Sequence, residues 1–291
     1  SRVRDTSWIH PGRAAWSWLD DHASPGHADA QRAAIDAAAQ AGWEYVTVDA
    51  GWHAEDVPGL VAYAADRGVR LILWFDVAGI SPAVLDRVAG WGVAGVKVDY
   101  FYNDRRLRIR QMDDVARWAA ARRLVIDFHG CTIPRGLQRT WPNVLSLEAV
   151  RGEEHAPLAA RDVVNLAFTR NAVGSMDFTP RGDPAQAIVF ESGLQHYAHG
   201  GPLLDEIPAD WDDTRLLSGA PDDHVVIARR DGTRWFVGGL FARPRRLAVR
   251  LPRGRYRARF ADGTQRDVSG TLTVAGDFAA ILTPYDAAHG T

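Results

Sequence analysis

The sequence is short of the features that identify several common protein classes. It has one cysteine, Cys131, in 291 residues, so no internal disulfide can form. No apolar run approaches the roughly 20 residues of a membrane-spanning helix, and the first residues lack the apolar stretch of a signal peptide. These absences exclude a disulfide-stapled module and a transmembrane protein, and they leave both a cytoplasmic and an exported location open.

Neither sign of charge dominates the chain. Its 34 basic and 36 acidic side chains give a formal net charge of -2, which excludes strong long-range attraction to nucleic acid or to an anionic membrane. Eleven tryptophans are the unusual feature, and two close pairs are Trp16 with Trp18 and Trp43 with Trp52. Aromatic rings pack in cores or line sugar-binding sites. The composition therefore favours a folded protein with a small neutral partner.

Residues 14–178 repeat one unit, in which a short apolar run ends in a polar or acidic residue and a helix-forming segment follows. The runs are residues 14–18, 45–49, 71–76, 95–99, 124–129, 144–148 and 174–177. Short apolar strands are typical of a parallel sheet covered by helices, here expected at residues 28–41, 57–67 and 81–89. We predict a (β/α)8 TIM barrel over residues 1–218, with its eighth strand near 203–205 or 214–217.

The pattern changes at about residue 219, where strand-like runs separated by turn signals replace the helical segments. The runs include H-V-V-I-A-R-R, W-F-V-G-G-L, Y-R-A-R-F and F-A-A-I-L, and a D-G dipeptide separates the first two. We predict a small C-terminal antiparallel β-sandwich domain over residues 219–291. Its Arg243, Arg245 and Arg246 are expected on a solvated strand face.

The chemistry of a TIM barrel is expected at the carboxyl ends of its strands. The predicted strands end in Asp49, Asp99, His129 and Glu148, and Glu154 follows in the loop after the sixth strand. Carboxylates are seldom buried without partners, so a converging ring of them would serve sugar hydroxyls, a metal ion or proton transfer. Glycoside hydrolysis needs two carboxyl groups across the scissile bond. Asp99 is the candidate nucleophile and Glu154 the candidate acid/base.

The neighbours of these two residues agree with their roles. Lys97 lies two residues before Asp99 and faces the same side, where its charge favours the ionised carboxylate or its amine binds a sugar hydroxyl. Glu148 and Glu153 lie close to Glu154 in the sequence, and like charges favour the protonated form that an acid catalyst needs. Capping of the following helix is the alternative role of Glu154.

The remaining candidates are substrate-binding residues, each with a structural alternative. Asp49 would bind hydroxyls of the sugar, or would stabilise the turn that Asp-Ala-Gly favours. His129 would donate a hydrogen bond to a hydroxyl or to the nucleophile, or would be a core histidine. The tryptophans would form an aromatic floor or would pack in the core. These are Trp16, Trp18 and Trp52.

Ordered segments along nearly the whole chain resemble glycoside hydrolase family 97. They are W-I-H-P-G-R-A-A-W-S-W (8–18), Y-V-T-V-D-A-G-W (45–52), G-V-K-V-D-Y-F (95–101), D-F-H-G (127–130), S-L-E-A-V-R-G-E-E (146–154) and F-T-R-N-A-V-G-S-M-D-F-T-P (168–180). The resemblance implies a bacterial carbohydrate-active enzyme with a (β/α)8 barrel followed by a small β-sandwich. Members usually carry a large N-terminal β-domain, which we expect this chain to lack because its sequence starts at the barrel.

The resemblance also implies a mechanism. Inverting members of that family are similar in placing a glutamate just after the histidine of the fifth strand, where this chain has Gly130. A carboxylate at the end of the fourth strand is the retaining pattern, which implies Asp99 as nucleophile and Glu154 as acid/base. The retaining branch is linked to α-galactosides, and β-L-arabinopyranosides share their ring stereochemistry. The implied partner is an oligosaccharide or glycoside, and the implied cofactor is calcium held by Glu148 and Glu154.

Other functions compete with this hypothesis. An α-glucosidase of the same family would share the fold. A metal-dependent hydrolase would need several histidines at the strand ends, where only His129 is expected. A non-catalytic carbohydrate-binding protein would have no need for both Asp99 and Glu154, and both are present. The sequence therefore favours a retaining exo-glycosidase that cleaves terminal α-galactoside-like sugars.

Overall fold

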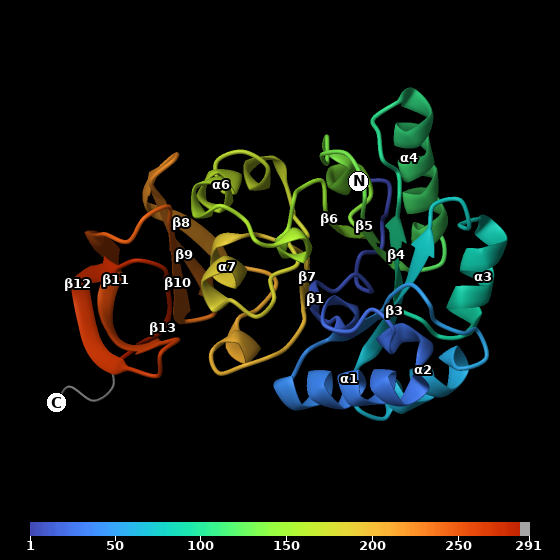
Figure 1. The fold of residues 1–291 in the computed structure, drawn as a ribbon, viewed down its shortest axis with the longest axis horizontal. Coiled ribbons are helices and arrows are strands. Elements are labelled where there is room, and N and C mark those ends of the chain that lie inside the picture. The colour runs from blue at the N-terminus through green and yellow to red at the C-terminus, as the bar shows by residue number, and fades with distance from the viewer. Residues whose placement is uncertain (286–291) are drawn as a thin grey trace. The chain divides into compact units, whose positions relative to one another are not determined.

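A computed structural model describes residues 1–285, which form two compact units (Figure 1). The first unit contains Ser1–His155, Val173–Arg181 and Ser192–Gly200. The second contains Ala156–Ala172, Gly182–Glu191 and the described chain from Gly201 onward. Within these residues no helix is both long enough and apolar enough to cross a membrane.

The first unit contains a parallel sheet that, within residues 1–285, has seven strands in the order β6-β5-β4-β3-β2-β1-β7. The strands are β1 (Gly12–Ala15), β2 (Tyr45–Val48), β3 (Arg70–Asp76), β4 (Gly95–Asp99), β5 (Val125–Phe128), β6 (Val144–Leu147) and β7 (Leu194–Tyr197). Its helices are α1 (Ala28–Ala41), α2 (Val57–Ala65), α3 (Pro82–Gly90), α4 (Arg106–Ala120) and the short α5 (Leu137–Thr140). Figure 1 shows α1 to α4 around the outside of the strands. The predicted α/β barrel is confirmed.

Local sequence explains several of these elements. Helix α3 begins after Ser81, whose hydroxyl accepts a hydrogen bond from the Val84 amide at 3.3 Å, as an N-cap residue does. Helix α1 ends at Gly42, which adopts the left-handed conformation with φ +70°. All five residues of β4 are buried, and Gly95 allows a close approach to Val125 of β5. This packing fixes the strand that carries Asp99.

The predicted strand at residues 174–177 is wrong as a regular strand. Its segment does lie beside β6, because the Asp177 amide donates to the Leu147 carbonyl at 2.9 Å. Two residues earlier, the Ser175 hydroxyl replaces the backbone hydrogen bonds that a regular strand would make. It donates to the Leu145 carbonyl at 2.7 Å and accepts from the Gly193 amide at 2.8 Å. The segment therefore bridges β6 to the chain before β7 through a side chain.

The predicted position of the eighth strand is also wrong. Residues 204–206 form a short 3-10 helix, and residues 214–217 belong to the antiparallel sheet of the second unit, where they pair with β9. The strand that completes the parallel sheet is β7, which pairs with β1. Its sequence L-Q-H-Y contains two buried polar residues, Gln195 and His196, so it lacks the apolar run that identified the other strands.

The second unit contains an antiparallel sheet, as predicted. Its described strands follow the order β12-β11-β13-β10-β9-β8. They are β8 (Asp213–Ala220), β9 (His224–Asp231), β10 (Arg234–Phe241), β11 (Arg246–Phe260), β12 (Gln265–Ala275) and β13 (Phe278–Pro284). The pairing of β11 with β12 shifts register between Arg250 and Arg255, and both strands curve strongly in Figure 1. Helices α6 (Ala160–Leu166) and α7 (Pro184–Val189) belong to the same unit.

Candidate active site

A cavity of about 310 Å³ lies at the carboxyl ends of the parallel strands, and it brings most of the predicted site residues together. Its lining consists of Trp16, Trp18, Asp49, Ala50, Trp74, Lys97, Asp99, Tyr100, Tyr102, His129, Gly130, Glu148, Glu154 and His155. Among the described residues, Trp52 is absent from this lining. Its indole donates instead to the Trp74 carbonyl at 2.8 Å and packs edge-on against Phe75. Trp52 therefore supports β3 behind the cavity wall.

Asp99, the last residue of β4, is buried and held by hydrogen bonds on both carboxylate oxygens. The Tyr100 amide donates to Oδ1 at 2.6 Å, and the Trp74 indole donates to Oδ2 at 3.1 Å. His129 Nδ1 lies 3.4 Å from the same Oδ2. Burial by itself would raise the pKa of Asp99, but the hydrogen bond and charge of His129 outweigh it and hold the pKa below its ordinary value. The carboxylate is ionised at neutral pH.

Lys97 points into the barrel and pairs with Asp49. Its ammonium lies 3.2 Å from Asp49 Oδ2 and 3.7 Å from the centre of the Trp16 ring. The Trp16 indole donates to the same carboxylate oxygen at 2.8 Å. Burial lowers the pKa of Lys97, but the charges of Asp49 and Asp177 outweigh it and raise the pKa above its ordinary value. Lys97 and Asp49 thus form a buried ion pair in the cavity wall.

His129 lies between the carboxylates of the site. Its Nδ1 faces Asp99, and its Nε2 lies 3.6 Å from Glu148 Oε1 and 4.0 Å from Glu154 Oε2. Burial, and after it the charge of Lys97, lowers the pKa of His129, but the surrounding carboxylates raise it to about 10. His129 is therefore an imidazolium at neutral pH, and its two ring nitrogens face the candidate nucleophile and the candidate acid/base respectively.

The two glutamates lie in the loop that follows β6. Glu148 accepts a hydrogen bond from the Gly130 amide at 2.7 Å. Burial raises the pKa of Glu148 to about 7, and the charge of Glu154 adds to that rise against the opposing effect of His129. Glu154 belongs to a short 3-10 helix, Glu153–His155, and its Oε1 lies 3.1 Å from His155 Nε2. Donor atoms of His129, Glu148 and Glu154 all lie within 4.8 Å of one another, so this group could hold a metal ion.

The backbone around the cavity is constrained where strands turn into loops. Tyr100 and Tyr102 after β4 have φ of +70° and +55°, and Ala149 after β6 has φ of +41°. Such angles are costly for residues other than glycine and cluster at functional sites. Gly130 also has a positive φ, +51°, and a Cβ built on it would lie 2.5 Å from Asp99 Oδ1. A side chain at position 130 and the observed position of Asp99 therefore exclude each other.

Beneath the cavity lies a buried polar group, of which the sequence analysis identified only Asp177, the last residue of a predicted run. His196 on β7 bonds the Thr47 hydroxyl at 2.8 Å through Nε2, and its Nδ1 lies 3.1 Å from Asp177 Oδ2. Burial, and then the negative charge of Asp177, raises the pKa of Asp127 well above its ordinary value. Burial also acts to raise the pKa of Asp177, but His196 outweighs it and the pKa is lowered. The surroundings therefore favour the protonated form of Asp127 and the ionised form of Asp177.

A signal for this group was present in the sequence. Side chains alternate along a strand, so a residue two positions before an inward-facing strand end also faces inward. By that rule the inward position of Lys97 follows from that of Asp99. In the same way Asp127 lies two residues before His129, and Thr47 two residues before Asp49. The register agrees, since Lys97 is opposite Asp127 in the pairing of β4 with β5.

Two family models match the chain. The model described as "Glycoside hydrolase 97" matches residues 8–150, and "Glycosyl-hydrolase 97 C-terminal, oligomerisation" matches residues 210–269. A "Probable retaining alpha-galactosidase" of Streptomyces bingchenggensis is 40% identical over 83% of this chain and 45% of its own length. A "Retaining alpha-galactosidase" of Bacteroides thetaiotaomicron is 30% identical over 82% of this chain and 46% of its own length. The chain spans less than half the length of these relatives.

Solved structures are similar over nearly the whole chain. A beta-arabinopyranosidase has a TM-score of 0.82 at 26% identity, over 97% of this chain and 56% of its own. A family 97 enzyme of Pseudoalteromonas sp. strain K8, in complex with acarbose, has a TM-score of 0.85 at 20% identity, over 98% of this chain and 62% of its own. Because its identity to this chain is only 20%, the Pseudoalteromonas enzyme shows a similar fold and nothing more. The family models and the relatives agree on one assignment, and the chain belongs to glycoside hydrolase family 97.

Proposed function

We propose that this chain carries the catalytic centre of a retaining exo-glycosidase that cleaves terminal α-galactoside-like sugars. The observation that supports the proposal most strongly is the position of Asp99 and Glu154 in one cavity, near opposite nitrogens of His129. The names of the two retaining α-galactosidases support the same reaction class.

The mechanism needs one ionised and one protonated carboxyl group. Asp99, kept ionised by its hydrogen bonds, attacks the anomeric carbon while Glu154 protonates the departing glycosidic oxygen. The covalent glycosyl-enzyme is then hydrolysed by a water that Glu154 deprotonates, which releases Asp99. The positive charge of His129 stabilises the ionised form of Asp99 in the resting enzyme.

Gly130 favours retention over inversion. In the inverting pattern, the carboxylate that activates water follows the histidine of the fifth strand, at position 130 of this chain. Gly130 supplies no carboxylate, and any side chain there would occupy the space of Asp99. The inverting α-glucosidase alternative therefore lacks its base in this cavity.

The sugar would bind against the walls of the cavity. Asp49, fixed by Lys97 and by the Trp16 indole, presents a carboxylate to sugar hydroxyls. Trp16 and Trp18 line the cavity as apolar walls, but their ring faces are already covered, because Lys97 lies over Trp16 and Trp18 stacks on both Trp16 and His22. An α-galactoside and a β-L-arabinopyranoside present the same ring stereochemistry to these walls, and the similar beta-arabinopyranosidase structure makes the second sugar part of the proposal.

Calcium would be held by Glu148 and Glu154. Carboxylate oxygens of Glu148 and Glu154 lie within 4.8 Å of each other, and oxygen is the ligand atom that calcium prefers. Calcium takes six to eight oxygen ligands, so two carboxylates supply part of its coordination, and water or further protein groups would supply the rest. A bound calcium ion would stabilise the anionic form of Glu148 and would help to fix the orientation of the acid/base, Glu154.

Azide rescue tests the two catalytic roles as a pair. In Asp99→Gly, azide fills the space of the lost carboxylate and attacks an activated aryl α-galactoside from that side, so the product is a β-galactosyl azide. In Glu154→Ala, the covalent intermediate still forms, azide attacks it, and the product is an α-galactosyl azide. NMR of the products distinguishes the two configurations. Absence of rescue in a folded Asp99→Gly protein, or the same anomer from both variants, would contradict the assignment.

A further inference from the structure

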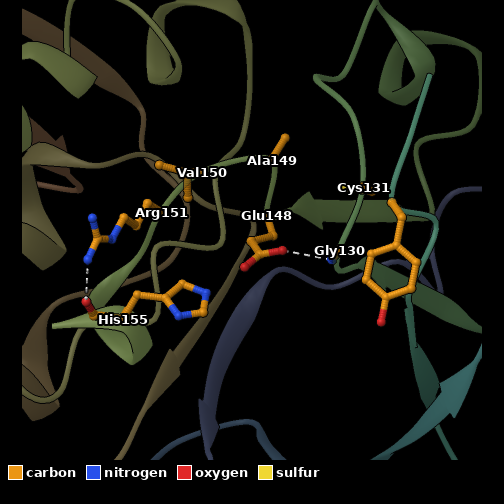
Figure 2. A pocket seen from close by; sticks show the side chains of 8 residues that line it. Gly130, Cys131, Glu148, Ala149, Val150, Arg151 and His155 are labelled. Atoms are coloured by element: carbon orange, nitrogen blue, oxygen red, sulfur yellow. Dashed lines mark hydrogen bonds between the residues drawn. The ribbon is translucent and has the colours of Figure 1, made fainter.

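A second cavity adjoins the catalytic cavity and shares part of its wall (Figure 2). Its lining consists of Tyr102, Gly130, Cys131, Glu148, Ala149, Val150, Arg151 and His155. Four of these residues, Tyr102, Gly130, Glu148 and His155, also line the catalytic cavity. Figure 2 shows Arg151 and His155 along one side of this space, with Glu148 at its centre. The second cavity therefore begins where the first ends, beside the loop that carries Glu154.

We propose that the second cavity is a leaving-group subsite, and that it takes a neutral second sugar ring stacked on Tyr102. This inference rests on the proposed function. The tyrosine is 74% exposed, which is unusual for an aromatic residue in a cavity wall. Its ring stacks on Tyr100 with centroids 5.2 Å apart and planes 12° from parallel. The pair forms a flat aromatic surface at the mouth of the site, of the kind that C-H faces of sugars cover.

This surface is held in a fixed relation to the nucleophile. Tyr100 packs edge-on against Trp74 at 5.6 Å, and the Trp74 indole donates to Asp99. The Tyr102 amide donates to the Gly130 carbonyl at 2.7 Å, which ties the tyrosine to the residue after His129. A positive φ is costly for tyrosine and persists where the surrounding structure fixes the backbone, as the hydrogen bond to Gly130 does at Tyr102.

The other side of the cavity is polar. Arg151 is exposed, and its guanidinium lies 3.4 Å from the His155 carbonyl, which leaves further N–H donors for sugar hydroxyls. The His155 ring lies 3.1 Å from Glu154 Oε1, so the candidate acid/base lies at the border between the two cavities. A glycosidic oxygen protonated by Glu154 would leave toward Tyr102 and Arg151. An aromatic face opposite hydroxyl-binding groups fits a neutral pyranose.

Two substrates with the same glycosyl group test the subsite. An α-galactosyl fluoride has a single-atom leaving group that cannot reach Tyr102, whereas a disaccharide with a terminal α-galactosyl residue places its second ring there. The readout is the ratio of kcat/KM for the disaccharide to kcat/KM for the fluoride. Loss of one stacking contact predicts that Tyr102→Ala lowers this ratio about tenfold. Tyr102→Phe keeps the aromatic face and should keep the ratio.

Leu107→Ala provides the matched control, because Leu107 is 75% exposed on α4 and lines neither cavity. It should leave both rates unchanged, and circular dichroism should show that all three variants are folded. An unchanged ratio in Tyr102→Ala, with both substrates hydrolysed by the unmodified chain, would overturn the subsite alone. Failure of the unmodified chain to hydrolyse the fluoride would overturn the proposed function and the subsite with it.

Discussion

Replacing Gly130 with alanine should displace the nucleophile, Asp99, although it removes none of the catalytic side chains. A Cβ at this position would lie 2.5 Å from Asp99 Oδ1 and 2.9 Å from the Tyr100 amide nitrogen. Ordinary contacts of a Cβ begin at 3.4 Å. The carboxylate of Asp99 and the start of the following loop must therefore move by about 1 Å, because the strand behind them is buried and closely packed.

The expected loss follows from that displacement. A misplacement of about 1 Å at a reacting group costs roughly 100-fold in rate, so kcat should fall by about that factor. The left-handed backbone angle adds a separate penalty of about 1 to 2 kcal/mol in folding stability, because alanine adopts it less readily than glycine. The two effects are separable, since one concerns the site and the other the backbone.

Gly42→Ala is the matched control. Gly42 has φ +70° at the end of α1, and a Cβ there would meet no atom within 4 Å. This variant should lose the same 1 to 2 kcal/mol, roughly, in urea denaturation and keep its kcat with an aryl α-galactoside. Wild-type kcat in a folded Gly130→Ala protein would refute the argument that Asp99 must hold its observed position.

Three further predictions concern charged groups. Lys97→Met leaves the Asp49 carboxylate buried without its cation and should cost about 3 to 5 kcal/mol in urea denaturation; a loss below about 1 kcal/mol would contradict the ion pair. Because folding raises the pKa of Asp127, the stability contributed by its carboxyl is fully present below the unfolded pKa of about 3.9 and declines as pH rises above it. Asp127→Asn should therefore become more stable relative to the unmodified chain as pH rises, and a constant difference in urea denaturation would contradict the protonated state. Calcium added to chelator-treated protein should raise Tm, and Glu148→Gln should abolish that rise; equal shifts in both proteins would contradict the site.

The sequence predicts the parallel strands well where apolar residues occupy at least one face of a strand. Buried runs such as residues 71–76 and 95–99 have no other stable position, and helix-forming segments follow them. Prediction from the sequence fails where side chains replace backbone hydrogen bonds or apolar contacts. Ser175 substitutes its hydroxyl for a ladder hydrogen bond, and His196 lies in β7, where each face carries a polar residue. A search for apolar runs detects neither feature.

The site is predictable to a similar extent, for a related reason. Parallel strands end at one edge, so the convergence of Asp49, Asp99 and Glu148 follows from their place in the repeat. The orientation of a bulky ring does not follow, because it depends on packing behind the wall; Trp52 is directed to the Trp74 carbonyl. The contacts of His129 with carboxylates on both sides likewise depend on loops after β4 and β6, whose course no periodicity encodes.

The covalent intermediate provides the most direct measurement of the central claim. A ring-fluorinated α-galactosyl fluoride forms the glycosyl-enzyme faster than water removes it, so the intermediate accumulates and survives digestion. Mass spectrometry of the peptides should locate one galactosyl-type label on Asp99, and Asp99→Asn should remain unlabelled. A label on Glu148 or Glu154, or catalytic turnover with inversion at the anomeric carbon and no label, would contradict the assignment of Asp99 as the nucleophile.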